Sequence, residues 1–296
     1  IEKIKNSLTL RVLKELQTLA EQNAEKYGKF WQTYGTLLKE GVSSDFKNKD
    51  RLKDLLRFNS SISEDSSTDV SLKDYVSRMR EGQKDIFYVT GGSRDAILHN
   101  PNLEYFRRER LEVLFLTDQI DDFMVVDLRD YDAKTLKNIS QGDIEGINDS
   151  DMSAAESSLS KEEKSDILAF FKKQLKDRVS EVSDSKRLVD NPCSLVTPKD
   201  GMTAQMEKMM KMMDQKFQGE KRTLEVNMGH PIIQNLSEIL QKNKKHPFLE
   251  DTVEQLYENS LLVEGLLENP VQILSRYQMF MESASAYELE KLNRVK

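Results

Sequence analysis

The chain has 296 residues, 38% of them hydrophobic and 32% charged, and its formal net charge is −7. This composition excludes a disordered chain, and the length favours two compact units over one. The acidic balance argues against a nucleic-acid partner, because a broad nucleic-acid-binding face needs an excess of Lys and Arg.

A single cysteine, Cys193, excludes an internal disulfide framework and is expected to be a buried small side chain. No segment approaches the roughly 18 apolar residues that a membrane-spanning helix needs, and no signal peptide is recognisable. The sequence thus predicts a cytoplasmic protein without a membrane partner. Since it opens at Ile1 inside a helical pattern, we expect it to be a piece of a longer protein.

The first part of the chain is predicted to begin with helices. Apolar residues at helical spacing predict one helix over residues 4–19 and a second over residues 27–38, with Gly41 as its end. Ser71 and Asp74 resemble a capping box that opens the next long helix.

A strand, helix, strand pattern follows. Continuous apolar runs at 86–89 and 113–116 flank a helix that starts at Asn100-Pro101, which predicts two parallel, buried strands in a βαβ unit. Residues 136–139 are predicted as an edge strand.

The second part of the chain begins after an acidic segment. Residues 142–166 contain eight acidic residues against two lysines. We assign residues 1–141 to the first domain, 142–161 to an acidic linker and 162–296 to the second domain. A helix capped by Ser160 and Glu163, strands near 194–197 and 223–227 and several helices make the second domain, and the whole chain, α+β.

Methionines form a stripe along one predicted helix. Spacings of four, three, one and three residues place five thioethers within an arc of about 100°: Met202, Met206, Met209, Met210 and Met213. The other side carries Thr203, Glu207, Lys208, Lys211 and Asp214, and is expected to be solvated. The stripe is either core packing or, if exposed, an adaptable surface for varied apolar partners.

Two apolar helices are predicted at the C-terminal end, one ending at Gly265 and the next starting at Asn269-Pro270. They present more apolar surface than one hairpin can bury. They pack either on the rest of the domain or against a second copy in a four-helix bundle.

No catalytic or metal site is predicted. Thr90-Gly91-Gly92-Ser93 sits between strand and helix but lacks the lysine and spacing of a phosphate-binding loop, so a plain turn is favoured over a nucleotide site. His99, His230 and His246 do not stand in a metal-binding spacing. A small nucleotide-binding enzyme and a purely structural dimer module stay open as alternatives.

Several segments resemble the bacterial branch of the ninety-kilodalton heat-shock chaperones. The segments, in order, are Phe30-Trp31-Gln32-Thr33-Tyr34-Gly35, Ser71-Leu72-Lys73-Asp74-Tyr75-Val76, Asp118-Gln119-Ile120-Asp121, Pro192-Cys193-Ser194-Leu195-Val196, Leu224-Glu225-Val226-Asn227 and His230-Pro231. The resemblance extends over essentially the whole chain.

The resemblance implies the end of the family's middle domain followed by its dimerisation domain. It implies a non-enzymatic fragment of an ATP-driven homodimeric chaperone, with ATP and Mg bound outside these residues and no cofactor or metal bound by them. It also implies that the methionine helix, together with Phe123, contacts partly unfolded client proteins. Co-chaperones that read a Met-Glu-Glu-Val-Asp tail are not expected, because the chain does not end in one.

On this basis the client surface is predicted to comprise Met202, Met206, Met209, Met210, Met213 and Phe123. The homodimer interface is predicted to comprise Val253, Leu256, Tyr257, Leu261, Val271, Leu274, Tyr277, Phe280 and Met281.

Overall fold

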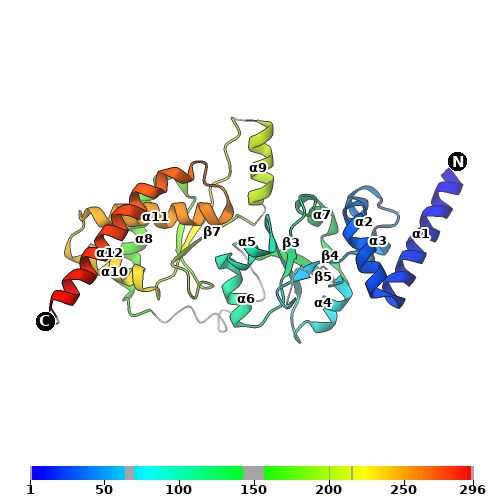
Figure 1. Ribbon diagram of the computed structural model, residues 1–296, viewed down its shortest axis with the longest axis horizontal. Coiled ribbons are helices and arrows are strands. Elements are labelled where there is room, and N and C mark those ends of the chain that lie inside the picture. Colours follow the sequence, from blue (N-terminus) through cyan, green and yellow to red (C-terminus); the bar gives the residue numbers. More distant parts are fainter. Residues whose placement is uncertain (1, 64–69, 143–156, 200, 215, 295–296) are drawn as a thin grey trace. The chain divides into compact units, whose positions relative to one another are not determined.

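The computed structural model describes residues 2–63, 70–142, 157–199, 201–214 and 216–294 (Figure 1). The chain forms two compact units: the first comprises Ile1–Asp151 with Lys199–Gln218, and the second Met152–Pro198 with Gly219–Lys296. Most of the predicted acidic linker lies outside the described residues. The α+β class is confirmed.

The methionine segment belongs to the first unit, although the sequence suggested one continuous domain over 162–296. It is inserted between two strands of the second unit, and none of its side chains contributes to that unit's hydrophobic core.

The first unit opens with three helices and continues with short helices around a sheet. Its helices are α1 (Glu2–Gln22), α2 (Ala24–Ser44), α3 (Lys49–Leu55), α4 (Leu72–Arg78), α5 (Arg94–Leu98), η1 (Pro101–Leu103), α6 (Glu104–Arg108), α7 (Asp121–Leu128) and, from the insertion, α9 (Ala204–Met213). Gly41 does not end α2. A Cβ there would lie 3.1 Å from Leu52 Cδ1, so the glycine permits close packing of α3 instead.

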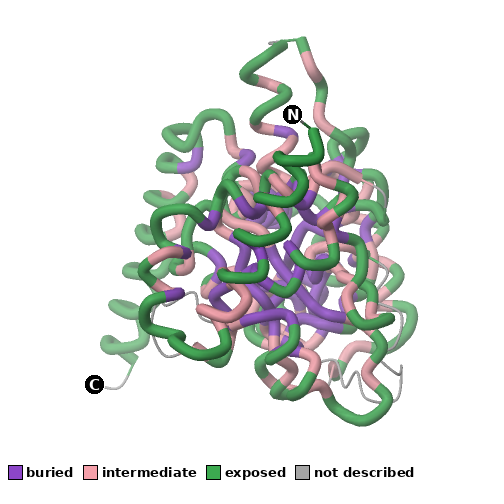
Figure 2. The backbone as a smooth tube through the Cα atoms, turned by 90° about the vertical axis from the view of Figure 1, so that its right-hand side faces the viewer, coloured by how far each residue is buried: buried purple, intermediate pink, exposed green. Residues whose placement is uncertain are grey.

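The sheet of the first unit has the order β1-β3-β2-β5-β4. Its strands are β1 (Asn59–Ser60), β2 (Asp85–Thr90), β3 (Leu114–Leu116), β4 (Asp130–Tyr131) and β5 (Lys134–Asn138). The predicted parallel pairing of β2 with β3 is confirmed. The predicted strand at 136–139 is present as β5, but its place at the edge is wrong: β5 lies between β2 and β4, because β4 and β5 form a tight hairpin. Strand residues such as Ile86, Val89, Leu114 and Leu116 are buried, and Figure 2 colours buried segments of the backbone purple.

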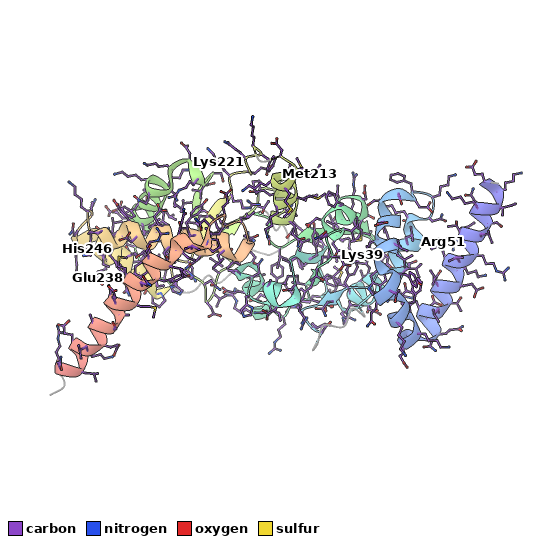
Figure 3. All side chains as sticks on the ribbon, turned by 45° about the horizontal axis from the view of Figure 1, so that its top comes forward. Lys39, Arg51, Met213, Lys221, Glu238 and His246 are labelled. Carbon is purple, nitrogen blue, oxygen red and sulfur yellow. The ribbon has the colours of Figure 1, made fainter. Side chains whose placement is uncertain are left out.

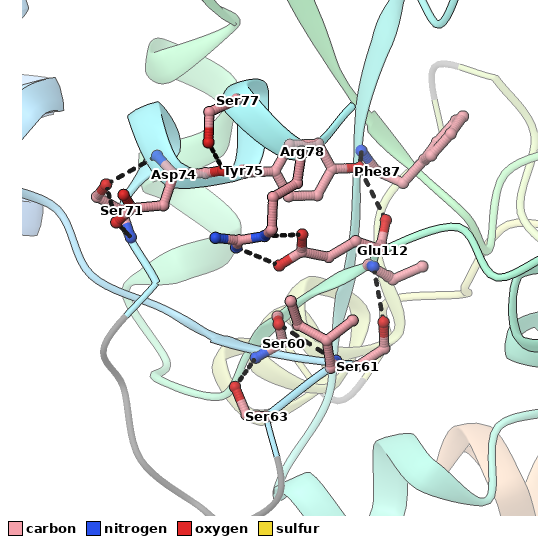
Figure 4. Close-up of polar contacts among 12 residues, drawn as sticks. Ser60, Ser61, Ser63, Ser71, Asp74, Tyr75, Ser77, Arg78, Phe87 and Glu112 are labelled. Carbon is pink, nitrogen blue, oxygen red and sulfur yellow. Dashed lines mark hydrogen bonds and ion pairs between the residues drawn. The ribbon is translucent and has the colours of Figure 1, made fainter. Parts of the chain in front are cut away.

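Helix α4 is fixed to the sheet by polar contacts (Figure 4). The predicted capping box is confirmed, with the Asp74 amide donating to Ser71 Oγ at 3.0 Å. The Tyr75 hydroxyl donates to the Glu112 carbonyl at 2.8 Å and accepts from the Phe87 amide at 2.9 Å. Burial raises the pKa of this phenol far above its usual value, so the hydroxyl stays protonated.

A buried ion cluster ties α2 to the start of α7. Lys39 Nζ lies 2.7 Å from a carboxylate oxygen of Asp118 and 2.7 Å from one of Asp121. Lys39 and Asp121 are 5% and 0% exposed, and the Lys39 ammonium also lies over the rings of Trp31 and Phe58. Burial raises the pKa of Asp121, and the charge of Lys39 opposes that rise. The lysine therefore favours the ionised form of a carboxyl group whose burial favours the neutral form. Figure 3 labels Lys39 on α2.

The second unit packs helices on a small three-stranded sheet of order β6-β8-β7. Its strands are β6 (Val182–Asp184), β7 (Cys193–Val196) and β8 (Thr223–Val226), and its helices are α8 (Lys161–Leu175), η2 (Lys176–Arg178), α10 (Pro231–Lys242), α11 (Pro247–Glu264), η3 (Pro270–Ile273) and α12 (Leu274–Arg294). The capping box of Ser160 and Glu163 and the left-handed Gly265 that ends α11 are confirmed.

We predict that Lys39→Met lowers the unfolding free energy of the first unit by about 3–5 kcal/mol, because it leaves the Asp121 carboxylate buried without its partner. Urea unfolding followed by the fluorescence of Trp31, the only tryptophan, measures this. Part of the lost stability should return as pH falls. The native pKa of Asp121, already above its unfolded value, rises further without the lysine, so the native state gains stability by taking up a proton.

The matched control is Lys29→Met on the same helix. Lys29 pairs with Glu25 at 2.6 Å in full exposure to solvent, and its loss should cost no more than about 0.5 kcal/mol. Equal losses in the two variants would contradict the role given to Lys39.

Candidate functional site

Helix α9 carries the methionine stripe except Met202, which precedes the N-cap, and leaves much of it in solvent. The helix begins at its N-cap, Thr203, whose hydroxyl accepts from the Met206 amide at 3.2 Å. Met212 and Met213 are 85% and 74% exposed, Met209 and Met210 are also exposed, and Met202 and Met206 are half-buried. Figure 3 labels Met213 at the end of α9. Core packing therefore does not account for the outer part of the stripe.

Two other methionines, Met124 and Met228, are buried and serve as a comparison for those of α9. Met124 on α7 is 0% exposed and belongs to the core of the first unit, and Met228 is 2% exposed in the core of the second. No thioether of α9 belongs to either core. The α9 methionines therefore differ from Met124 and Met228 in two ways: they lie outside both cores, and several of them stand on one helix.

The polar side of α9 is not the solvated face that the sequence suggested. Glu207 is buried, and its carboxylate lies 3.4 Å from the Lys211 ammonium one turn later. Lys208 and Lys211 are half-buried. The prediction failed because helical spacing separates the two faces of a helix but does not say which one meets protein. On α9 the polar residue Glu207 is buried, whereas the apolar side chains of Met209, Met210 and Met213 are exposed to solvent.

Helix α7 adds a second exposed apolar group in the first unit. Phe123 is 41% exposed and Val126, three residues later, is 55% exposed, whereas Met124, Val125 and Leu128 are buried. Phe123 is thus accessible, as a client contact requires. Val126 was missed from the sequence, although its spacing from Phe123 places both on one face.

Helix α7 also carries a buried carboxyl group, that of Asp122. Asp122 is 1% exposed, and burial raises its pKa; the hydroxyls of Thr203 and Thr90 and the charge of Lys208 act in the opposite direction. Thr203 is the N-cap of α9, and the start of α9 belongs to the same unit as α7.

The predicted dimer residues divide between two helices with different surroundings. Val253, Leu256 and Tyr257 on α11 are buried in the core of their own unit, and Leu261 packs against that core. The first three are therefore covered by their own unit in the single chain, and their contact with a second copy stays a prediction. Their spacing is that of any apolar helix face, and α11 uses it to pack on α8 and β7.

Helix α12 and the turn before it keep their apolar side chains exposed. Val271, Leu274, Tyr277 and Met281 are all accessible to solvent. Phe280 is half-buried and packs edge-on against Phe248 at 5.6 Å between ring centroids. A groove beside it is lined by Ile239, Phe248, Phe280, Ala284 and Tyr287, together with the polar residues Asn235, Glu238, Lys242 and Ser283.

The glycine pair after β2 is explained by packing. A Cβ on Gly91 would lie 2.6 Å from Ile97 Cγ1, and Ile97 is buried. Ser93 caps α5, which is only five residues long. The close approach of α5 to the strand therefore requires a glycine here whether or not a phosphate binds.

Histidines and the cysteine have local roles. His230 and His246 cap α10 and α11, each accepting through Nδ1 from a backbone amide, which sequence reasoning missed. Cys193 is buried, and burial raises the pKa of its thiol far above its usual value. Within the ranges described above, no group of three or more His, Cys, Asp or Glu side chains is placed to hold a metal ion, and no helix is long and apolar enough to cross a membrane.

Comparison with known proteins identifies the family. The family model described as Hsp90 protein matches residues 1–294, and the chain belongs to this family. It is similar to the chaperone protein HtpG of Chlorobaculum tepidum, with 41% identity over 295 residues, 96% of this chain and 45% of the relative. The chaperone protein HtpG of Geobacter sulfurreducens is 40% identical over 267 residues, 90% of this chain and 41% of the relative.

The chain therefore spans less than half the length of these relatives, and it corresponds to their C-terminal portion. The expected resemblance to the ninety-kilodalton heat-shock chaperones is confirmed.

Proposed function

We propose that this chain is the client-binding and dimerising part of an Hsp90-family chaperone. The observation that carries the proposal is the exposure of four thioethers on α9, Met209, Met210, Met212 and Met213. Methionine is flexible and polarisable, so one surface can adapt to apolar segments of different shape. Phe123 and Val126 on α7 add apolar contacts in the same unit.

Burial of the polar residue Glu207 supports this role. A solvent-exposed apolar face is unfavourable by itself, by about 1.5–3 kcal/mol for each large side chain that could have been buried. In the orientation that α9 adopts, Met212 and Met213 are exposed and do not gain this free energy of burial. The ion pair of Glu207 and Lys211 lies on the more buried side instead. A surface that binds apolar segments of unfolded proteins explains the orientation; a purely structural module with buried methionines does not.

We predict that replacing Met209, Met210, Met212 and Met213 together by Ser weakens suppression of client aggregation by about tenfold, which corresponds to about 1.4 kcal/mol of binding free energy. Light scattering of a denatured model protein diluted into buffer with the chain measures the effect. The fold should survive, because exposed side chains contribute little to stability.

The control replaces the same four residues by Leu, which keeps the apolar surface and should keep suppression. Unfolding of the Ser variant, or suppression equal to that of the unchanged chain, would show that these methionines are not the client surface.

We further propose that the chain homodimerises through α12 and the turn before it. Exposed Val271, Leu274, Tyr277 and Met281 supply the apolar surface, and the groove beside Phe280 extends it. An isologous four-helix arrangement buries such a stripe against its own copy. Leu261 at the edge of the second core is placed to contribute to the rim.

We predict that Leu274→Glu combined with Met281→Glu converts a dimer into a monomer in analytical ultracentrifugation, because two charges enter the centre of the apolar contact. Both positions are exposed in the single chain, so its circular dichroism should not change. Glu282→Lys, one residue away on the polar side of α12, should stay dimeric. A double variant that remains dimeric, or an unchanged chain that is monomeric, would contradict this interface.

ATP-driven motion is proposed for the intact protein only. Binding and hydrolysis of ATP with Mg would take place in residues outside this chain and would reposition the client and dimer surfaces. No cofactor is assigned to these residues, and a cytoplasmic location stays part of the proposal.

A further inference from the structure

Half of the methionines of this protein lie within twelve residues. The chain has 12 methionines, and six of them are Met202, Met206, Met209, Met210, Met212 and Met213. The last four are exposed on one helix that contributes to neither hydrophobic core. Thioethers are the side chains that peroxides oxidise without prior deprotonation, and access largely sets the rate. The question is what oxidation would do at this place.

We propose that α9 is a site of reversible oxidation by hydrogen peroxide, and that oxidation switches off client binding. The proposal rests on the proposed client-binding function, and it adds a regulatory modification to that surface.

The chemistry requires only the thioether and the peroxide. A sulfur lone pair attacks one peroxide oxygen, the O–O bond breaks, and an S–O bond forms. The departing hydroxide takes the proton from the transferred oxygen and leaves as water. Sulfur loses two electrons and the peroxide gains them, so the products are methionine sulfoxide and water. Methionine sulfoxide reductases return the sulfoxide to the thioether with electrons from thiols.

The position of α9 makes this modification selective. Met212 and Met213 are 85% and 74% exposed, whereas Met124 and Met228 are almost completely buried. Peroxide should therefore reach these α9 thioethers before Met124 and Met228; Met281, 70% exposed in the single chain, lies in the proposed dimer contact. Because no α9 methionine supports a core, their oxidation should leave both units folded. Oxidation of Met124 or Met228, in contrast, would put a polar oxygen into a packed interior.

The consequence for binding follows from polarity. A sulfoxide is a strong hydrogen-bond acceptor, and burying it against an apolar client segment without a donor is costly. Four such groups on one face convert the exposed part of the stripe from an apolar to a polar surface. The modified helix should then resemble the serine variant in its contact with clients.

The test treats the full chain with hydrogen peroxide and maps sulfoxides by peptide mass spectrometry. Oxidation at Met212 and Met213 should be at least about tenfold faster than at Met124 and Met228. The treated chain should lose client suppression while keeping its circular dichroism and urea unfolding, and methionine sulfoxide reductases A and B should restore suppression.

Two variants separate the surface from other effects. The quadruple Leu variant of Met209, Met210, Met212 and Met213 should suppress aggregation with and without peroxide. Met79→Leu removes a half-buried methionine on the first core and should stay as sensitive to peroxide as the unchanged chain.

Failure of this inference is distinguishable from failure of the client-binding proposal. If the Ser variant loses suppression but the sulfoxidised chain retains it, the switch is wrong and the client surface stands. If the Leu variant remains sensitive to peroxide, or buried Met124 and Met228 oxidise as fast as Met212, the switch is also wrong. If the Ser variant keeps full suppression, the client surface itself is wrong.

Discussion

One buried lysine holds the helix that links the main body of the first unit to its exposed apolar surface. Lys39 on α2 neutralises Asp121 at the start of α7, where a carboxylate with no exposure would otherwise be strongly destabilising. With that end fixed, the first turn of α7 points Phe123 outward and Asp122 inward toward Thr203. The charge pair therefore does more than stabilise a helix contact. Its acidic member, Asp121, also lies on the same helix as the exposed Phe123.

Helix α9 illustrates a general consequence of placing an amphipathic helix outside a core. Helix α9 stands between β7 and β8 in the sequence, and none of its apolar side chains belongs to either core. The Glu207 and Lys211 pair lies toward protein, and the outer thioethers remain available. The same exposure that makes this surface suitable for varied apolar partners also makes it accessible to small oxidants.

Local signals in the sequence predicted much of the secondary structure. The capping boxes at Ser71 and Ser160 and the left-handed Gly265 were readable because each depends on a few neighbouring residues. The parallel strands β2 and β3 were readable because both are continuous apolar runs. Even the methionine stripe was visible as a face of one helix.

The sequence could not show whether a given face of a helix contacts the rest of the protein or solvent. Apolar spacing on α11 and α12 is alike, yet Val253 is buried in its own unit and Leu274 is exposed. Gly41 looked like a helix end but serves close packing against Leu52. The same limit applies to α9, where the face expected to be solvated holds a buried glutamate. Tertiary neighbours decide all three cases, and they are distant along the chain.

The most direct test of a thioether surface is to observe the thioethers during binding. With methionine methyl groups labelled with carbon-13, the chain is titrated with a denatured, soluble client and followed by methyl NMR. The account predicts that the resonances of Met209, Met210, Met212 and Met213 shift or broaden, while those of buried Met124 and Met228 keep their positions. Unchanged α9 resonances in the presence of bound client would contradict it.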